Sequence, residues 1–229
     1  MENRNDSEFM RPIASVDLVI FAQSEGRLDL LLARRGNAPF AGDWALPGGF
    51  VHADTDIDLE AAARRVLRDK TGVETPYLEQ LGTFGGAARD PRGWSLSVAY
   101  MALIVADGVT LRSGSGTTEA AWVAADTDIA LAFDHRSILD AALARLRSKV
   151  EYSTLPAHLL PVAFTLGELQ AAYEGILGRV LEKSAFRKRI AEADFVEPIP
   201  GEMRRASNRP AQLYRLKRAR HTTLFDRTL

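Results

Sequence analysis

Apolar residues follow two different spacings in the first 150 residues of the chain. Dense apolar runs at residues 15–22 and 28–35 flank the turn sequence QSEGR, and this arrangement predicts two neighbouring β-strands. Residues 59–71 instead carry apolar side chains three and four positions apart, and Gly72 follows them, so we expect an amphipathic helix ended by a glycine. The apolar face of this helix is expected to consist of Leu59, Ala62, Ala63, Val66 and Leu67.

The same two spacings continue to about residue 150. Residues 77–85, 96–106 and 119–125 are expected to form further strands, and the second has the apolar density of a buried strand. The pattern at residues 135–152 predicts an amphipathic helix. Its inward side chains are expected to be Ile138, Leu139, Ala142, Leu143 and Leu146. This order of strands and helices predicts an α/β sandwich with a mixed sheet.

The stretch at residues 153–164 contains two prolines, Pro156 and Pro161, and predicts a junction between two domains. A helix should follow it, with Thr165 as N-cap, Glu168 as the capping-box partner and Gly178 as the stop signal. We therefore divide the chain into a domain at residues 1–150 and a second domain at residues 151–229.

The second domain has the expected elements of a winged helix–turn–helix. A second helix is predicted over residues 184–193, with Ser184 as its N-cap. The segments FVEPIP and QLYRLK are expected to form two short strands around the basic loop GEMRRASNRPA, which would make a β-wing.

Composition narrows the class of protein. The chain has 229 residues, of which 46% are hydrophobic and 26% charged, as expected of a globular protein. It contains no cysteine, which excludes disulfides and thiolate metal sites and fits a cytoplasmic location. The first residues lack the apolar core of a signal peptide, and no run approaches the roughly 18 apolar residues of a membrane span. We expect no membrane partner.

The net charge of −1 hides an uneven distribution. Residues 151–229 carry 13 Lys and Arg against 9 Asp and Glu, and residues 179–220 carry 12 against 5. A basic block on an acidic body favours a polyanionic partner for the second domain. The alternative is a solvated basic face.

The sequence DWALPGGFV and the expected helix after it resemble the Nudix family, whose signature is G-x5-E-x7-R-E-U-x-E-E-x-G-U, with U an aliphatic residue. In that family the glutamates hold Mg²⁺, which polarises a pyrophosphate for attack by water. The resemblance implies a Nudix α/β/α fold. The alternative, an ordinary amphipathic helix, does not account for the flanking Trp-x-Leu-Pro-Gly-Gly. The residues that match are Gly49, Arg65, Leu67, Gly72 and Val73.

The acidic positions of the signature are mostly lost. Counted back from Gly72, they hold Ile57, Val66, Asp69 and Lys70. Because a lysine ammonium repels a nearby metal cation, we expect hydrolysis to be lost or very weak, with no catalytic residues. Whether Mg²⁺ binds is left open, and candidate replacement ligands are Asp56, Asp58 and Glu60.

A Nudix scaffold that does not hydrolyse can still bind a nucleotide. Arginines can hold a diphosphate by forked hydrogen bonds, aromatic rings can stack on a base, and glycines allow close approach of the backbone. The alternative for each residue alone is a surface arginine or a core aromatic. The candidate ligand-binding residues are Arg34, Arg35, Trp44, Pro47, Gly48, Gly49, Phe50, Arg65, Arg89 and Arg92.

The two helices of the second domain have the pattern of a DNA-binding motif. Basic residues lie near the start of the second helix, while Phe186 and Ile190 are expected to point inward, as in a recognition helix. Arginine can pair with guanine, and wing arginines can reach phosphates. The alternative is a small helical domain with a solvated basic face. The candidate DNA-binding residues are Lys183, Ser184, Arg187, Lys188, Arg189, Arg204, Arg205 and Arg209.

Taken together, the two halves resemble the NrtR family, the Nudix-related transcriptional regulators of NAD metabolism. The resemblance covers about residues 13–218 and includes DLEAAA, FDHRSILDAALARLR, FTLGELQAAYEGILG and KSAFRK. It implies a homodimer that binds a palindromic double-stranded DNA operator and represses NAD biosynthesis or salvage genes. It also implies a nucleotide effector, commonly ADP-ribose, that releases the DNA, and no other cofactor.

Three classes of function remain open on the sequence. The first is a ligand-responsive repressor. The second is a weak hydrolase of ADP-ribose or another nucleoside diphosphate derivative. The third is a DNA-binding or scaffold protein with a vestigial, ligand-free Nudix domain. For the first class, we expect the helix at residues 137–150 and the Pro156/Pro161 junction to transmit the ligand signal.

Overall fold

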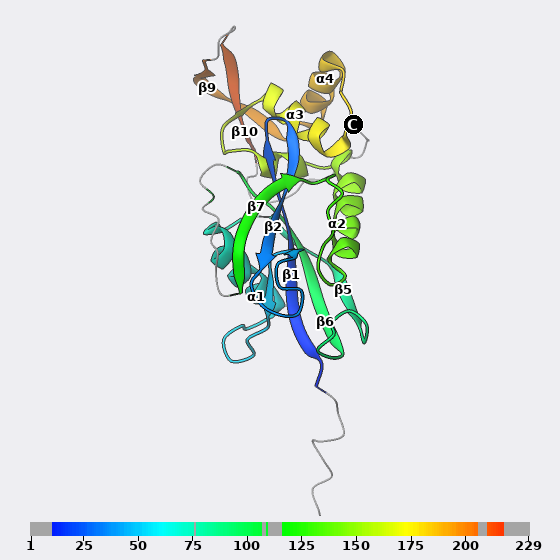
Figure 1. The fold of residues 1–229 in the computed structure, drawn as a ribbon. Coiled ribbons are helices and arrows are strands. Elements are labelled where there is room, and N and C mark those ends of the chain that lie inside the picture. Colours follow the sequence, from blue (N-terminus) through cyan, green and yellow to red (C-terminus); the bar gives the residue numbers. More distant parts are fainter. Residues whose placement is uncertain (1–10, 76, 107–108, 110–115, 206–209, 218–229) are drawn as a thin grey trace, which may run out of the picture.

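A computed structural model of the chain describes residues 11–75, 77–106, 109, 116–205 and 210–217. A seven-stranded mixed sheet forms the body of its first half (Figure 1). β1 runs parallel to β6 and antiparallel to β2 and β4, and the pairs β2–β3, β2–β7 and β5–β6 are antiparallel. The strands are β1 (Ile13–Ser24), β2 (Arg27–Arg35), β3 (Trp44–Ala45), β4 (Gly48–Phe50), β5 (Tyr77–Gly86), β6 (Ser95–Leu103) and β7 (Thr117–Ala124).

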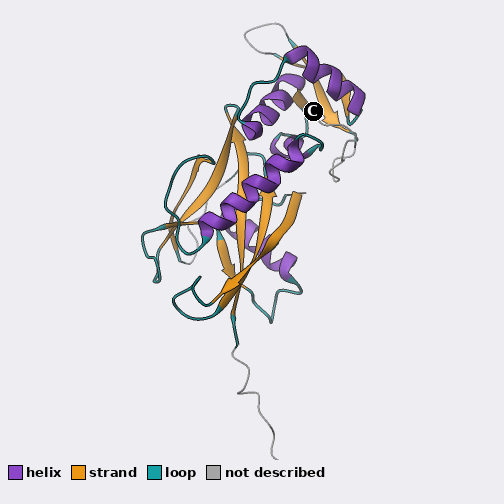
Figure 2. Ribbon diagram, turned by 90° about the vertical axis from the view of Figure 1, so that its right-hand side faces the viewer, coloured by secondary structure: helices purple, strands orange, loops and turns teal. Residues whose placement is uncertain are grey.

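Two helices cover opposite faces of this sheet (Figures 1 and 2): α1 (Leu59–Thr71) and α2 (His135–Val150). Alternate residues of β1 supply both cores, since Val19 and Phe21 pack with α2 whereas Leu18 and Ile20 pack with α1. The predicted α/β sandwich with a mixed sheet is confirmed. One detail was wrong: Leu59, expected on the buried face of α1, is 38% exposed.

The hairpin of β1 and β2 is longer than predicted. The expected turn QSEGR shrinks to Glu25 and Gly26, which have φ angles of 50° and 78°. Two consecutive positive φ angles match a type I′ turn, whose twist suits a tight hairpin. The hairpin therefore extends beyond the body of the sheet to the second half of the chain (Figure 1).

The second half forms a winged helix–turn–helix, as predicted. Its elements are η1 (Leu155–Leu159), β8 (Phe164–Thr165), α3 (Leu166–Leu177), α4 (Lys183–Ala193), β9 (Val196–Arg204) and β10 (Ala211–Leu216), with strand order β8-β10-β9. The predicted capping box is present, because Glu168 N–H donates to Thr165 Oγ1 and Thr165 N–H donates to a Glu168 carboxylate oxygen. Gly178 ends α3 at a φ of 67°.

Two local predictions in this half were wrong. The N-cap of α4 is Glu182 rather than Ser184, because the Glu182 carboxylate accepts hydrogen bonds from the N–H groups of Ser184 and Ala185. Arg204 was expected in a loop but closes β9, which continues past the expected FVEPIP segment. Arg209 lies outside the described residues.

The two halves share one apolar core. Residues of η1 such as Leu155 and Leu159 are at most 3% exposed, so the expected junction is a buried 3-10 turn. The Tyr173 hydroxyl on α3 donates to Ser153 O at 2.7 Å. Gly175 of α3 lies so close to the β1–β2 turn that a Cβ there would be 2.7 Å from Gly26 O. In the described part of the chain, no helix is both long and apolar enough to span a membrane.

Candidate functional site

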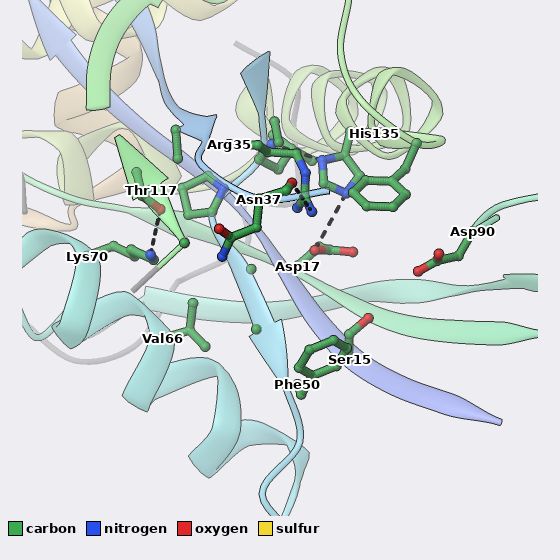
Figure 3. Close-up of a pocket in the computed structure, with 18 of the residues that line it drawn as sticks. Ser15, Asp17, Arg35, Asn37, Phe50, Val66, Lys70, Asp90, Thr117 and His135 are labelled. Atoms are coloured by element: carbon green, nitrogen blue, oxygen red, sulfur yellow. Dashed lines mark hydrogen bonds and ion pairs between the residues drawn. The ribbon is translucent and has the colours of Figure 1, made fainter. Parts of the chain in front are cut away.

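A cavity of about 540 Å³ opens between α1, the start of α2 and one end of the sheet (Figure 3). Asp17 of β1 and Gly48 of β4 are paired neighbours on its floor. A Cβ on Gly48 would lie 2.2 Å from Asp17 Oδ1, so only glycine allows the carboxylate to occupy this place.

The Asp17 carboxylate lies beside Arg89 and His135 in the cavity wall. Arg89 Nη2 lies 3.4 Å from Asp17 Oδ2 and donates to Asp134 Oδ1 at 2.9 Å. Arg89 is only 8% exposed, so its guanidinium is a buried link between the sheet and the start of α2. This geometry gives Arg89 a positioning role in the cavity wall.

His135 is the first residue of α2 and lies at the cavity wall, 4% exposed. Leu46 N–H donates to His135 Nδ1 at 2.9 Å, which leaves the ring proton on Nε2, 3.6 Å from Asp17 Oδ1. Burial lowers the pKa of His135, and the imidazole is therefore neutral at pH 7. Figure 3 shows the ring directed towards Asp17.

Three further arginines of the cavity are held by carboxylates. Arg65 makes a two-pronged contact with Asp56, with Nη2–Oδ2 and Nε–Oδ1 distances of 2.7 and 2.8 Å, and this keeps the pKa of Asp56 well below its usual range. Arg92 Nη2 lies 2.7 Å from Asp90 Oδ2, with its guanidinium 5.3 Å from the Phe50 ring centre. Arg34 Nη1 lies 3.3 Å from Glu119 Oε2.

Arg35 and Lys70 differ from these arginines. Neither has a carboxylate oxygen within 4.0 Å among the described residues. Arg35 Nε donates to Pro39 O at 2.8 Å, and Lys70 Nζ donates to Thr117 Oγ1 at 2.8 Å. Burial lowers the pKa of both side chains, and Arg92 adds to the effect at Arg35. Two half-buried cations that form no ion pair with any described residue thus line the cavity.

The acidic residues near α1 do not fit the magnesium site of a Nudix enzyme. Asp56 is occupied by Arg65, Asp58 caps α1 through Ala61 N–H, and Glu60 pairs with Arg64. Asp69 lines the cavity, but the described residues contain no group of three or more metal-ligating side chains. Mg²⁺ needs several oxygen ligands around it. Asp56, Asp58 and Glu60 already have other partners, and Asp69 alone supplies too few oxygens.

The structure brings together nine of the ten candidate ligand-binding residues. Trp44 does not line the cavity; it packs against the core on the α2 side, while the next residue, Ala45, lines the cavity. Of the four positions aligned with the acids of the signature, Ile57 is 92% exposed and does not line the cavity. The other three, Val66, Asp69 and Lys70, line it. Four further residues that were not predicted from the sequence also line the cavity: Asp17, Asn37, Thr117 and His135.

The outward face of α4 carries the candidate DNA-contacting residues. Phe186 and Ile190 are buried against α3, as expected, and Lys183, Ser184, Arg187, Lys188 and Arg189 are all exposed. Lys188 approaches Glu192 at 4.0 Å, whereas Lys183, Arg187 and Arg189 have no ion pair within the described ranges. An exposed helix with basic residues beside its first turn has the form needed to enter a major groove.

The predicted wing residues divide between two environments. The Arg204 guanidinium pairs with Glu168, the capping residue of α3, and donates to Ala163 O at 3.0 Å. Arg204 therefore ties β9 to the start of α3. Arg205 is exposed at the end of this strand.

Comparison with known proteins covers both halves. Residues 156–216 match the family model of the NrtR DNA-binding winged helix domain, and residues 11–142 match the NUDIX domain. The chain is 44% identical over 225 residues to the ADPR responsive transcriptional repressor NtrR of Acinetobacter baylyi, which covers 97% of this chain and 89% of the relative.

Two solved structures of an NrtR protein are similar to this chain. A crystal structure of Shewanella oneidensis NrtR complexed with a 27mer DNA aligns with a TM-score of 0.85 and 38% identity, over 94% of this chain and 99% of that one. The NUDIX domain of the same protein, complexed with ADP ribose, aligns with a TM-score of 0.57 and 38% identity, over 63% of this chain and 94% of that one. With a Nudix fold, an NrtR-type winged helix and similarity along the whole chain, this protein belongs to the NrtR family of Nudix-related transcriptional regulators.

Proposed function

We propose that this protein is a transcriptional repressor of NAD biosynthesis or salvage genes that is released from DNA by ADP-ribose. The observation that carries the proposal is the similarity along the whole chain to a repressor described as ADP-ribose responsive. The geometry supports both activities, because one chain holds a nucleotide-sized cavity with cations in its wall and an exposed basic helix.

We assign DNA contact to α4 and the wing, through Lys183, Ser184, Arg187, Lys188, Arg189 and Arg205, with Arg209 as a further candidate. The repressor acts in the cytoplasm as a homodimer on a palindromic operator. Two recognition helices must then fit half-sites about one helical turn, roughly 34 Å, apart. ADP-ribose acts by favouring a dimer geometry that does not fit both half-sites.

The Nudix box of this protein is assigned a sensing role. Val66 and Lys70 occupy positions where the family signature has glutamates, and Asp56, Asp58 and Glu60 have other partners. Asp69 is then the one carboxylate at a signature position in the cavity wall. ADP-ribose would therefore remain intact in the cavity. Cleavage of ADP-ribose to AMP and ribose 5-phosphate in the presence of Mg²⁺ would instead support the weak-hydrolase alternative.

The deciding experiment is fluorescence anisotropy of a labelled duplex from upstream of the protein's own gene, titrated with protein at a fixed salt concentration. A duplex of scrambled sequence is the control. We expect tight binding to the first duplex only, and its loss when ADP-ribose is added. Binding without a response to ADP-ribose would contradict the assigned effector, and no preference between duplexes would contradict the repressor function.

A further inference from the structure

The residues of the cavity wall do not match the metal site that a Nudix fold implies. A Nudix fold implies a divalent metal that neutralises a bound pyrophosphate. Three acids near α1, Asp56, Asp58 and Glu60, pair with Arg65, the first turn of α1 and Arg64. Asp69 is the one carboxylate at a signature position that remains in the cavity wall, and one carboxylate does not supply the several oxygen ligands that Mg²⁺ needs. The other acids of the signature are absent. In their place the cavity wall contains a lysine, Lys70, on the inner side of α1 (Figure 3).

Two cations of the cavity wall have no carboxylate partner among the described residues and can therefore contact a bound anion. Arg34, Arg65, Arg89 and Arg92 each contact a carboxylate within 3.4 Å. Arg35 on β2 and Lys70 on α1 make their described hydrogen bonds to neutral oxygens only, those of Pro39, Asn37 and Thr117. Burial of each cation with no described carboxylate in direct contact is unfavourable, and burial lowers the pKa of both side chains despite acids farther away.

Both cations line the same cavity. Lys70 comes from α1 and Arg35 from the end of β2, and the Asn37 side chain lies between them in Figure 3. Thr117 Oγ1 accepts a hydrogen bond from Lys70 Nζ and so fixes where the ammonium lies. A polar space with a cation on each side matches an anion that carries charge on two neighbouring groups.

We propose that Lys70 and Arg35 take the place of the divalent metal, so that this cavity binds the diphosphate of its effector without any metal ion. The proposal deepens the proposed function and rests on it. Each phosphate of a diphosphate diester carries one negative charge, and two side-chain cations balance the pair as one divalent ion would. A metal ion placed beside Lys70 would be repelled by it.

This arrangement also accounts for an effector that remains intact. In a metal-dependent Nudix reaction the ion polarises the pyrophosphate and lowers the pKa of the attacking water. Lysine and arginine hold the phosphates by charge and hydrogen bonds but do not coordinate a water molecule in this way. Lys70 and Arg35 are thus binding residues of a site without a water-activating group.

Calorimetric titration of the full-length protein with ADP-ribose tests the proposal. The titration is made once in EDTA and once in excess Mg²⁺. We expect the two dissociation constants to agree within about twofold, because no step of binding uses the metal. Binding that requires Mg²⁺ would overturn the metal-free site and leave the effector assignment intact. No binding in either buffer would overturn both.

Variants of α1 give the second arm of the experiment. Lys70→Met keeps the apolar stem and removes the charge, and should weaken binding in EDTA about ten- to hundredfold, as expected for a charged hydrogen bond. The matched control is Arg68→Met on the same helix, since Arg68 is 56% exposed and lies outside the cavity wall. It should bind as the wild type does.

A charge reversal separates the role of the cation from a packing effect. Lys70→Glu should lose binding in EDTA and regain part of it when Mg²⁺ or Mn²⁺ is added, because a carboxylate at this place can ligate a metal. Circular dichroism melts establish that the variants are folded. Unchanged affinity of Lys70→Met, or equal losses in Lys70→Met and Arg68→Met, would overturn the proposal.

Discussion

The absence of a side chain at Gly48 makes room for the Asp17 carboxylate. Gly48→Ala would place a Cβ 2.2 Å from Asp17 Oδ1 and 3.0 Å from Val16 O, so the carboxylate must leave its place beside Arg89 and His135. We expect a loss of about 1–3 kcal/mol in the free energy of unfolding, as for overpacked sites, measured by urea denaturation. Gly85→Ala in β5 is the control, since its nearest neighbours lie at 3.5 Å. Equal losses in both variants would contradict the assigned contact.

Protonation of His135 gives a prediction about pH. Burial lowers its pKa below the value of about 6.5 expected in the unfolded chain, so below that pH the unfolded state binds the proton first. The contribution to stability is present above about pH 6.5 and is lost as the pH falls further. We therefore expect the free energy of unfolding to decrease between about pH 7.5 and 5.5.

The comparison variant is His135→Asn, whose amide oxygen can accept the hydrogen bond of Leu46 N–H. Its decrease over the same pH range should be smaller than that of the wild type. His158, whose pKa is also lowered by burial, is present in both proteins and cancels in the difference. Identical pH dependence in the two proteins would contradict a neutral, buried His135.

Residue by residue, local sequence predicted the part of the cavity made by one continuous segment. The loop before α1 supplies Pro47, Gly48, Gly49 and Phe50, and its sequence pattern alone was informative. Trp44 lies outside the cavity because neighbouring residues of a strand face opposite sides of the sheet, and Ala45 takes the cavity side. Asp17 and His135 depend on the β1–β4 register and on the position of α2, which no local pattern specifies.

At the scale of elements, the winged helix separates basic residues that hold it together from those that can contact a partner. Arg204→Ala removes the link from β9 to Glu168 and Ala163 O, and should lower the midpoint of thermal unfolding. Arg187→Ala on α4 should leave this midpoint unchanged and weaken DNA binding, with a shallower salt dependence. An unchanged midpoint in Arg204→Ala, or a lowered midpoint with unchanged DNA binding in Arg187→Ala, would contradict this separation of roles.

Elements were predictable where a long periodic pattern ends in a strong signal. α3 has both, with the capping box at Thr165 and the glycine at its end. The start of α4 was wrong because the side chain of Glu182, two residues before Ser184, accepts hydrogen bonds from the N–H groups of Ser184 and Ala185 and so begins the helix earlier. β3 and β4 have only two and three residues, too few to show any alternation.

At the scale of the whole molecule, the β1–β2 hairpin links the cavity to the winged helix. Asp17 and Arg35 line the cavity at one end, and the turn at Gly26 meets α3 at Gly175 at the other. Gly175→Ala would place a Cβ 2.7 Å from Gly26 O, and backbone must then shift. We expect ADP-ribose to bind this variant as it binds the wild type but to release less DNA, measured by calorimetry and anisotropy.

Gly167→Ala is the matched control for this prediction. It makes the same substitution in the same helix, and its Cβ would meet only Thr165 Oγ1 at an ordinary 3.7 Å. Its DNA release by ADP-ribose should equal that of the wild type. Full release from Gly175→Ala would exclude the hairpin as the route of the signal and favour α2 and the η1 junction.

The lysine on the inner face of α1 has a consequence for how a cell would use this protein. An enzyme that cuts its ligand responds to the rate at which the ligand is supplied, and it erases the signal as it measures it. A cavity that holds the ligand intact responds to concentration alone, with half occupancy at the dissociation constant. Occupancy then rises and falls reversibly with the ligand and leaves no record of earlier levels.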